Sequence, residues 1–379
     1  MGEPIPPPRA CVAVLGGGQL GRMLGLAGIP MGLRFRFLDP VAGAPAGAVG
    51  DLVVGGLGDR AALDRVAEGA HVVTYEWEGV PADGARYLAD RLPLFPSARS
   101  LAVSQDRVAE KRLCGDLGIA TAPFAAVDDR AALHSALGTI GTPAILKTRS
   151  GGYDGKGQFR LDAPGDADAA WDALGPLGHL VLEARVAFTR ELSVLACRGR
   201  DGEVAVYPVA ANIHEGGILR VSRVPTVGRS SQAAAAAIAR RLLEALDHVG
   251  VLCVELFETG DGSLVVNELA PRVHNSGHWT IEGAVTSQFE NHLRAILGLP
   301  LGAPTLVMPN AMVNCIGALP DREAILGIAG AHLHDYDKSP RAERKVGHVT
   351  VLADDEATLD ERLDRVEHVI RARPSHAAS

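Results

Sequence analysis

Apolar runs separated by glycine-rich turns predict an α/β arrangement at the start of the chain. A buried-strand pattern at Cys11–Leu15 leads into glycine-rich residues 16–21 and a helical stretch, after which a second strand ends at Asp39. Another strand at His71–Tyr75 and a following helix continue the alternation. Strand–helix–strand units of this kind build doubly wound sheets, so residues 1–100 are predicted to form a Rossmann-like domain.

The hydrophobic pattern changes after residue 100. A predicted helix over 105–117 precedes a strand at Ala144–Lys147, a glycine-rich loop and several short strands. A long alanine-rich helix over 231–246, with Ser231 expected as its N-cap, is followed by a hairpin and another helix. Residues 101–298 are therefore predicted to form a large second domain.

The last part of the chain begins with a predicted linker. Residues 299–304 contain two prolines and a glycine, and strands are expected near 312–316 and 347–352. A final helix carries its apolar residues on one face. These features predict a small C-terminal domain over 299–379, so the whole chain is expected to be of mixed α/β and α+β class.

Composition restricts the kind of protein without identifying it. The 379 residues have a formal charge of -8, with 22% charged and 47% hydrophobic residues. No apolar run is long enough to cross a membrane, and the first eight residues hold four prolines and no signal-sequence pattern. Five cysteines without a CxxC pair suit buried thiols in a reducing compartment. We therefore expect a cytoplasmic protein with no membrane or nucleic-acid partner.

The first glycine-rich loop has two interpretations. Residues 16–21 match G-x-G-x-x-G between a strand and a helix, with Asp39 after the next strand, which is typical of dinucleotide binding. The same glycines also allow a tight turn and close packing without a dinucleotide. The amides of Gln19 and Leu20 lie at a helix N-terminus, which favours an anion. Glu76, after the following strand, is either a ligand contact at this edge or a solvated acid.

A second glycine-rich loop carries polar chemistry suited to polyphosphate. Residues 150–158 read Ser-Gly-Gly-Tyr-Asp-Gly-Lys-Gly-Gln, and Lys147 ends the strand before them. Mobile backbone amides together with Lys147 and Lys156 are able to surround phosphate groups. The spacing is not that of a P-loop, and the alternative is a merely flexible surface loop.

The predicted hairpin places two carboxylates opposite each other. If Asp261-Gly262 is a two-residue turn, Glu255 pairs with Glu268 across the strands. Like charges at this position destabilise a sheet, so a cation between them is expected, and Mg²⁺ bridged to phosphate is the usual occupant. The alternative is a protonated or water-separated pair on an exposed face. The same face is expected to hold the apolar residues Cys253, Phe257, Leu264 and Val266.

Residues 267–280 continue from this strand without a hydrophobic period, which suits a binding loop. Two histidines close to an arginine favour contacts with an anion or substrate. A zinc site is disfavoured because no further cysteines or histidines complete a tetrahedral set. The polar residues concerned are Arg272, His274, Asn275, Ser276 and His278.

A cluster of basic residues near the C-terminus stands out in an acidic protein. Four cations fall within eight residues, and a proline and a glycine in the same segment indicate a structured loop. The cluster is either a phosphate site or a solvated surface. Its members are Lys338, Arg341, Arg344 and Lys345.

Taken together, these segments resemble the ATP-grasp enzymes of purine biosynthesis known as N5-carboxyaminoimidazole ribonucleotide synthetases. The most specific segments are 151–158 and 267–280, whereas the first glycine loop is shared with many folds. The resemblance spans nearly the whole chain, and the proline-rich start is the clear departure from it. The remaining segments are residues 16–23, 74–80, 188–194 and 336–348.

The resemblance implies a fold and a set of ATP contacts. The fold is an ATP-grasp fold with an N-terminal Rossmann-like pre-ATP-grasp domain, a mobile lid at about 122–190 and a small C-terminal domain. ATP is expected between two parts of the grasp unit, with Mg²⁺ on Glu255 and Glu268. The implied ATP-binding residues are Arg107, Lys147, Gly152, Tyr153, Asp154, Gly155, Lys156, Gly157, Gln158, Glu183, Ala184, Arg185, Val186, Glu191, His214, Asn267 and Glu268.

The resemblance also implies a reaction. Bicarbonate attacks the γ-phosphate of ATP to give carboxyphosphate and ADP, and the exocyclic amine of aminoimidazole ribonucleotide captures the carboxyl group. Asp154, Lys156 and Arg272 are the expected catalytic residues, and a homodimer and functional coupling to the downstream mutase are expected as well. The expected substrate-binding residues are Gln19, Leu20, Glu76, Tyr153, Asp154, Arg272, His274, Asn275, Ser276, Lys338, Arg344 and Lys345.

Two other functions remain open from the sequence. A formate-using ATP-grasp transformylase acting on glycinamide ribonucleotide shares the architecture but not the His-Asn-Ser-Gly-His-Trp segment at 274–279. An NAD-dependent oxidoreductase would use the first glycine loop, but it leaves the facing carboxylates of the hairpin unexplained.

Overall fold

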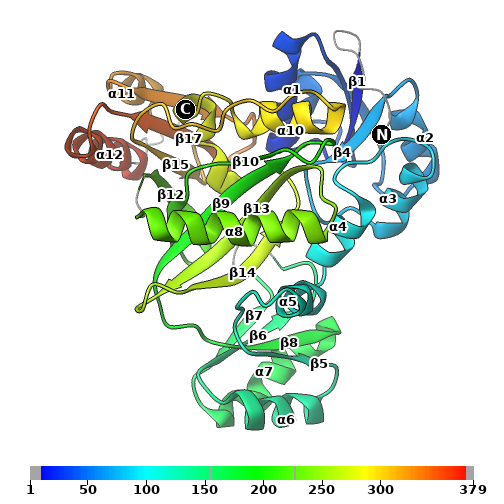
Figure 1. The fold of residues 1–379 in the computed structure, drawn as a ribbon, viewed down its shortest axis with the longest axis vertical. Helices are drawn as coiled ribbons and strands as arrows, with labels where there is room; N and C mark the ends of the chain where they lie inside the picture. Colours follow the sequence, from blue (N-terminus) through cyan, green and yellow to red (C-terminus); the bar gives the residue numbers. More distant parts are fainter. Residues whose placement is uncertain (1–9, 153–155, 226–227, 373–379) are drawn as a thin grey trace, which may run out of the picture.

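The structure is a computed structural model that describes residues 10–152, 156–225 and 228–372. Its N-terminal part forms a parallel sheet in the order β3-β2-β1-β4 (Figure 1). This parallel order confirms the predicted Rossmann-like start. The elements are β1 (Cys11–Leu15), α1 (Gln19–Gly28), η1 (Ile29–Met31), β2 (Arg34–Asp39), η2 (Pro45–Ala48), β3 (Asp51–Val54), α2 (Arg60–Ala67), β4 (Val72–Tyr75), α3 (Ala82–Ala89) and α4 (Ala98–Ser104).

A second sheet, β5-β8-β6-β7, is antiparallel and lies at the bottom of Figure 1. Helices α6 and α7 pack on its face that holds Leu146 and Leu182. Because side chains alternate along a strand, Ile145 and Lys147 point to the opposite face. The elements are α5 (Arg107–Asp116), β5 (Phe124–Val127), α6 (Arg130–Ile140), β6 (Ala144–Thr148), β7 (Gln158–Leu161), η3 (Pro164–Asp166), α7 (Ala167–Leu174), η4 (Gly175–Leu177) and β8 (Leu180–Ala184).

The third sheet runs β14-β13-β9-β11-β12-β15-β17-β16, with β10 paired to β9. Strands after the predicted linker at 299–304 extend this sheet, because β15 pairs with β12. The elements are β9 (Phe188–Arg198), β10 (Val204–Val206), β11 (Ala210–Glu215), β12 (Ile218–Val224), α8 (Arg229–Ala245), β13 (Gly250–Thr259), β14 (Leu264–Ala270), η5 (Asn275–Gly277), α9 (Thr280–Gly283), α10 (Gln288–Leu297), β15 (Asn310–Ile316), α11 (Arg322–Leu326), β16 (Ala331–Asp335), β17 (Lys345–Leu352) and α12 (Glu356–Arg371).

Helices α8 and α10 cover opposite faces of the large sheet. Leu252 and Val254 pack in the cluster that contains the buried face of α8, whereas Val251 and Cys253 pack with α10. The predicted Ala-rich helix is confirmed, but its expected serine N-cap is wrong. α8 begins at Arg229 with Gly228 as its N-cap, three residues before Ser231, and the Ser231 hydroxyl donates instead to Glu258 at 2.8 Å. None of the described helices has the length and apolar character needed to cross a membrane.

Two buried histidines connect the N-terminal part to the large sheet. The Nε2 atom of His292, on α10, lies 2.8 Å from the Thr74 hydroxyl of β4, and its Nδ1 accepts from the Val251 amide at 3.1 Å. His248 similarly lies 2.7 Å from the Ser100 hydroxyl of α4. Burial lowers the pKa of His292 to about 3 and that of His248 to about 4. Both rings are therefore neutral when the protein is folded.

We predict that these histidines make the protein less stable in mild acid. Between pH 6.5 and about 4 the unfolded histidines bind protons that the folded ones do not, so the free energy of unfolding falls as pH is lowered. Each histidine contributes up to about 1.4 kcal/mol per pH unit to this loss. Denaturant unfolding of His292→Gln at pH 7, 6 and 5 should show a shallower slope than the unsubstituted protein. The exposed His134→Gln is the control, and equal slopes for both variants would contradict the prediction.

Candidate active site

A cavity of about 590 Å³ opens where the three sheets meet. Its wall includes residues from the N-terminal sheet, α5, the four-stranded antiparallel sheet and the large sheet. Most of the predicted site residues are brought together here. Those that line it are Gln19, Leu20, Glu76, Arg107, Lys147, Gly152, Lys156, Gly157, Gln158, Glu191, His214, Glu255, Asn267, Glu268, Arg272, His274, Asn275 and Lys345.

Other predicted site residues do not line this cavity. Tyr153, Asp154 and Gly155 lie outside the described residues. Lys338 lines a smaller cavity of about 400 Å³. The remaining predicted residues absent from the wall of the large cavity are Glu183, Ala184, Arg185, Val186, Ser276 and Arg344.

The hairpin pairs Glu255 with Glu268, as predicted, but for a different reason. Thr259 N donates to Ser263 O at 3.0 Å, so the loop has three residues, 260–262, and not two. The longer loop shifts the pairing of the two strands by one residue. A bulge shifts it back, because Glu255 pairs with Glu268 whereas Leu256 pairs with Val266. The two shifts cancel, so the carboxylates face each other as predicted.

The bulge also corrects the predicted composition of this face. Asn267 is the extra residue of β14, so strand alternation is interrupted there. Leu264 and Val266 consequently pack beneath α8 with Leu256, on the opposite side from Glu268. Without the bulge, Glu268 would share a face with these apolar residues.

The two facing carboxylates have different electrostatic surroundings. Arg107 donates to Glu268 at 2.8 Å, and although burial raises the pKa of Glu268, the charge of Arg107 lowers it below its usual value. Burial and the charge of Glu268 raise the pKa of Glu255 to about 7, although the charges of His214 and Lys345 oppose this effect. Of the two facing carboxylates, Glu255 therefore has the less favourable surroundings for a negative charge.

The carboxylate pair fits a hard divalent cation. Within the described ranges, no group of three or more histidine, cysteine, aspartate or glutamate side chains is arranged as a metal site. Mg²⁺ commonly takes only one or two protein carboxylates and fills its remaining positions with water and phosphate oxygens. Glu255 and Glu268 thus match magnesium carried on a polyphosphate better than a metal held entirely by protein.

A buried ionic centre includes Lys147, which lines the cavity. Lys147 Nζ lies 2.9 Å from Glu183 Oε2, and Lys111 Nζ lies 3.4 Å from the same oxygen. The Glu183 side chain is only 4% exposed, so it holds the lysines and does not face the cavity. The sequence analysis missed Lys111, because a charged residue in a charged helix usually faces solvent.

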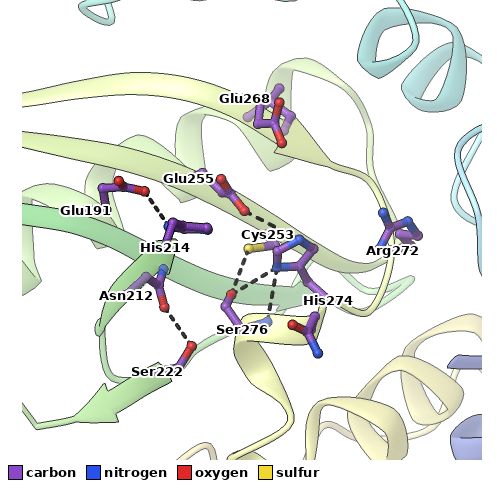
Figure 2. A network of polar contacts seen from close by, with 12 residues as sticks. Glu191, Asn212, His214, Ser222, Cys253, Glu255, Glu268, Arg272, His274 and Ser276 are labelled. Carbon is purple, nitrogen blue, oxygen red and sulfur yellow. Dashed lines mark hydrogen bonds and ion pairs between the residues drawn. The ribbon is translucent and has the colours of Figure 1, made fainter. Parts of the chain in front are cut away.

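Glu191 and His214 form a polar pair on the large sheet (Figure 2). His214 Nδ1 lies 2.5 Å from Glu191 Oε2, and both side chains line the cavity. Burial lowers the pKa of His214, but the contact with Glu191 outweighs it and raises the pKa above its usual value. The wall of the cavity therefore includes a carboxylate that is paired with a histidine.

The loop after β14 supplies side chains that are fixed by neighbours. In Figure 2 the His274 ring lies between Glu255 and Ser276. Its Nδ1 accepts from the Ser276 amide at 3.3 Å and lies 2.9 Å from the Ser276 hydroxyl, while Nε2 lies 3.5 Å from Glu255. Burial and the nearby charge of Arg272 lower the pKa of His274 to about 3. Ser276 thus contacts the predicted histidine and not the cavity.

Arg272 is held by an acid that the sequence analysis did not identify. Its guanidinium forms an ion pair with Glu78, which follows β4 in the N-terminal part. Burial alone would raise the pKa of Glu78, but Arg272 lowers it to about 2. The second acid of Glu76-Trp-Glu78 was a weak signal for this contact. His278, by contrast, is fully buried, and its ring lies 5.0 Å from His348 in the core.

The first glycine loop is occupied by acids of the protein itself. Glu76 accepts from the amides of Gly18 and Gly21 at 2.7 Å each, and Asp39 accepts from Gly17 at 2.8 Å. A Cβ atom at Gly18 would lie 2.7 Å from the Glu76 carboxylate. The glycines therefore admit Glu76, which takes the position where a dinucleotide pyrophosphate would sit.

The C-terminal basic cluster is divided between two environments. Lys345 lines the large cavity, whereas Lys338 contacts the Gln19 side chain, which also lines it. Burial and the nearby charges of Arg344 and Lys345 lower the pKa of Lys338 to about 8, although Glu76 opposes this effect. Arg344 donates to the carbonyl of Ser339 at 3.2 Å. The cluster thus approaches the end of the cavity that Glu76 occupies.

Comparison with known proteins agrees with this geometry. Family models match as the ribonucleotide synthetase preATP-grasp domain over residues 10–105, the ATP-grasp domain over 112–289 and the phosphoribosylaminoimidazole carboxylase C-terminal domain over 310–362. The fold and the site therefore define an ATP-grasp enzyme.

Individual relatives narrow the class. The N5-carboxyaminoimidazole ribonucleotide synthase of Pseudomonas aeruginosa is 49% identical, covering 95% of this chain and 99% of the relative. That of Bacillus subtilis is 40% identical, covering 93% and 94%. The chain belongs to the N5-carboxyaminoimidazole ribonucleotide synthase family.

Solved structures agree with this assignment. The synthetase of Thermus thermophilus has a TM-score of 0.91 and 52% identity, covering 96% of this chain and 99% of that one. The Aspergillus clavatus synthase in complex with ADP and 5-aminoimidazole ribonucleotide has a TM-score of 0.90 and 32% identity, again covering 96% and 99%.

We predict that Glu183 is mainly a structural residue. Glu183→Gln leaves Lys111 and Lys147 without their shared counter-charge, and breaking a buried ion pair costs about 3 kcal/mol or more. Urea unfolding without nucleotide measures this loss directly. The control is Glu367→Gln on α12, whose i,i+4 pair with Arg371 should be worth about 0.5 kcal/mol. Equal stability of the two variants would contradict the assignment.

Proposed function

We propose that this chain carries out the ATP-dependent carboxylation of 5-aminoimidazole ribonucleotide with bicarbonate, a step of purine biosynthesis. The products are N5-carboxyaminoimidazole ribonucleotide, ADP and phosphate. The observation that carries the proposal is a single cavity that joins facing carboxylates, a buried lysine and a cationic end, in a chain of this family. The cavity therefore has the volume and the charged residues needed to accommodate a metal-bound nucleotide and a second, phosphorylated substrate.

ATP is proposed to bind along the carboxylate half of the cavity. Arg107 and Lys147 would neutralise phosphate oxygens, while Glu191 is suited to the ribose hydroxyls. Glu255 and Glu268 would hold Mg²⁺, which supplies charge neutralisation for the transferring phosphoryl group. The described loop residues Gly152, Lys156, Gly157 and Gln158 lie on the same wall, and the predicted adenine contacts at 183–186 stay a prediction.

The reaction then needs positioning more than covalent help from the protein. A bicarbonate oxygen attacks the γ-phosphorus, the bond to the β-bridging oxygen breaks, and carboxyphosphate and ADP form. The exocyclic amine next bonds to the carboxyl carbon, phosphate leaves, and the amine loses a proton. Arg272 and Lys156 are proposed to hold the anionic groups. Asp154, the predicted partner of the amine, lies outside the described residues.

The ribonucleotide is proposed to occupy the opposite end of the cavity. Glu76 is proposed to border the ribose together with Gln19 and Leu20, which line the same cavity. Lys338, Arg344 and Lys345 are proposed to attract the 5′-phosphate. His274 and Asn275 line the wall between the two halves, where the carboxyl group must pass from one substrate to the other.

The alternative functions are less well supported. The formate-dependent transformylase is not favoured, because the relatives reported above are carboxylating synthases. The NAD-dependent oxidoreductase is disfavoured because Glu76 occupies the amides of the first glycine loop. A homodimer, a cytoplasmic location and coupling to the mutase stay predictions, the location resting on five cysteines that are all free thiols.

We predict that ADP formation requires bicarbonate and rises strongly when aminoimidazole ribonucleotide is added. The reason is that carboxyphosphate must form from bicarbonate before the amine can capture it. A coupled ADP-release assay with ATP and Mg²⁺ measures this, with formate and glycinamide ribonucleotide as the control substrates. Full turnover with formate and none with bicarbonate would overturn the proposed function.

We also predict that Lys338→Ala and Arg344→Ala weaken ribonucleotide binding and leave ATP affinity nearly unchanged. A hydrogen bond to a charged group is worth about 1.5 to 3 kcal/mol, which corresponds to roughly tenfold to a hundredfold per substitution. Steady-state KM values for both substrates provide the measurement, and Arg322→Ala, an exposed cation on α11, is the control. An equally large rise in the KM for ATP would instead indicate that the cluster binds the nucleotide or stabilises the fold.

A further inference from the structure

Helix α5 reaches the bulge of β14 with three side chains on one face. Arg107, Glu110 and Lys111 are spaced i, i+3 and i+4, so they project from the same side of the helix. Arg107 Nη1 donates to the Glu268 carboxylate at 2.8 Å, and Lys111 Nζ donates to the Asn267 carbonyl at 3.2 Å. One helix thus contacts consecutive residues of the strand that carries a proposed metal ligand.

Glu110 makes the third of these contacts. Its Oε2 accepts from the Leu269 amide at 2.8 Å, and its side chain is almost fully buried. Its Oε1 is buried, and no residue in the described part of the chain forms a hydrogen bond with it. Burial, reinforced by the charge of Glu268, raises the pKa of Glu110 to about 8. Burying an acid in this environment costs free energy, and a carboxyl group is not usually needed to accept a single backbone hydrogen bond.

The contact between Glu110 and Leu269 lies on the outer edge of the large sheet. β14 is an edge strand of the large sheet, so its outer amides and carbonyls have no strand to pair with. Val266 N donates to the Ala120 carbonyl at 2.8 Å on this edge, and the next outer groups are those held by Lys111 and Glu110. The bulge at Asn267 is therefore fixed from the outside by α5 and the chain that follows it.

We infer that Glu110 is a positioning residue that acts through Glu268, because it holds the Leu269 amide and thereby fixes the bulge that turns Glu268 toward Glu255. The inference rests on the proposed function, in which these two carboxylates hold Mg²⁺. Losing the hydrogen bond would free the bulged strand to shift by one residue, and such a shift moves a side chain to the other face of the sheet.

Nucleotide binding with and without metal tests this role. ADP affinity is measured by calorimetry in Mg²⁺ and in EDTA, so that the ratio reports the metal-dependent gain alone. Glu110→Leu should lose roughly tenfold or more of this ratio, as supporting residues of metal sites typically do, with ADP affinity in EDTA unchanged. Glu110→Gln should keep the ratio, because its amide oxygen still accepts from Leu269. Glu110→Asp, a milder change that withdraws the acceptor, should fall between them.

The matched control is Gln232→Leu, which removes the same kind of bond outside the cavity. Gln232, on α8, accepts from the Val209 amide at 2.8 Å. This variant should keep the full metal-dependent gain even if its melting temperature falls. An unchanged ratio in both Glu110→Leu and Glu110→Asp would overturn the inference. A loss in Glu110→Gln as large as in Glu110→Leu would also overturn it, because Glu110 would then act as a carboxylate ligand.

The same measurement separates this inference from the proposed function. An unsubstituted protein whose ADP affinity is the same in Mg²⁺ and in EDTA would overturn the proposed metal site and the inference with it. A clear metal-dependent gain in the unsubstituted protein that persists in Glu110→Leu and Glu110→Asp would overturn the inference alone.

Discussion

The repulsion between Glu255 and Glu268 is the constraint on which the site depends. Two carboxylates that face each other across a sheet destabilise it, and here Glu268 forms an ion pair with Arg107. Burial and the charge of Glu268 raise the pKa of Glu255, and the opposing charges of His214 and Lys345 do not offset them. In the proposed metal site, a cation between the two would turn an unfavourable pair into shared ligation, so metal binding and the stability of this hairpin would be linked.

The surrounding structure keeps this pair in place. Helix α5 holds the bulged edge of β14, and the ionic centre of Lys111, Lys147 and Glu183 connects the same helix to the four-stranded antiparallel sheet. Glu78 reaches from the N-terminal part to hold Arg272. Each part of the chain therefore contributes a charged contact to one cavity, which explains why the site residues are scattered along the sequence.

Local patterns in the sequence predicted much of the fold and some of the site. The parallel start and the C-terminal helix α12 follow from hydrophobic periodicity, and the segment at 267–280 was correctly singled out as supplying residues to the cavity wall. The pairing of Glu255 with Glu268 was predicted correctly only because a longer turn and a bulge cancel. Neither feature has a local signal, since the bulge at Asn267 is fixed by side chains of α5.

The burial of these charged residues was not predictable from the sequence alone. Glu110 and Lys111 lie in a helix of charged residues that reads as solvent-exposed, and only tertiary packing buries them. In the first glycine loop, the residue that fills the amides is Glu76, some sixty positions away in the sequence. Contacts of this kind join distant segments, so hydrophobic periodicity gives no indication of them.

The most direct test of the link between the facing carboxylates and metal binding is the unfolding free energy of Glu255→Gln, with and without Mg²⁺ and ADP. This substitution removes one of the two facing charges and leaves the ion pair of Arg107 with Glu268 intact. We expect the variant without ligands to be at least as stable as the unsubstituted protein, and to lose the additional stabilisation that Mg²⁺ gives with ADP. A ligand-free variant that loses several kcal/mol, or one that keeps the full magnesium effect, would contradict the account.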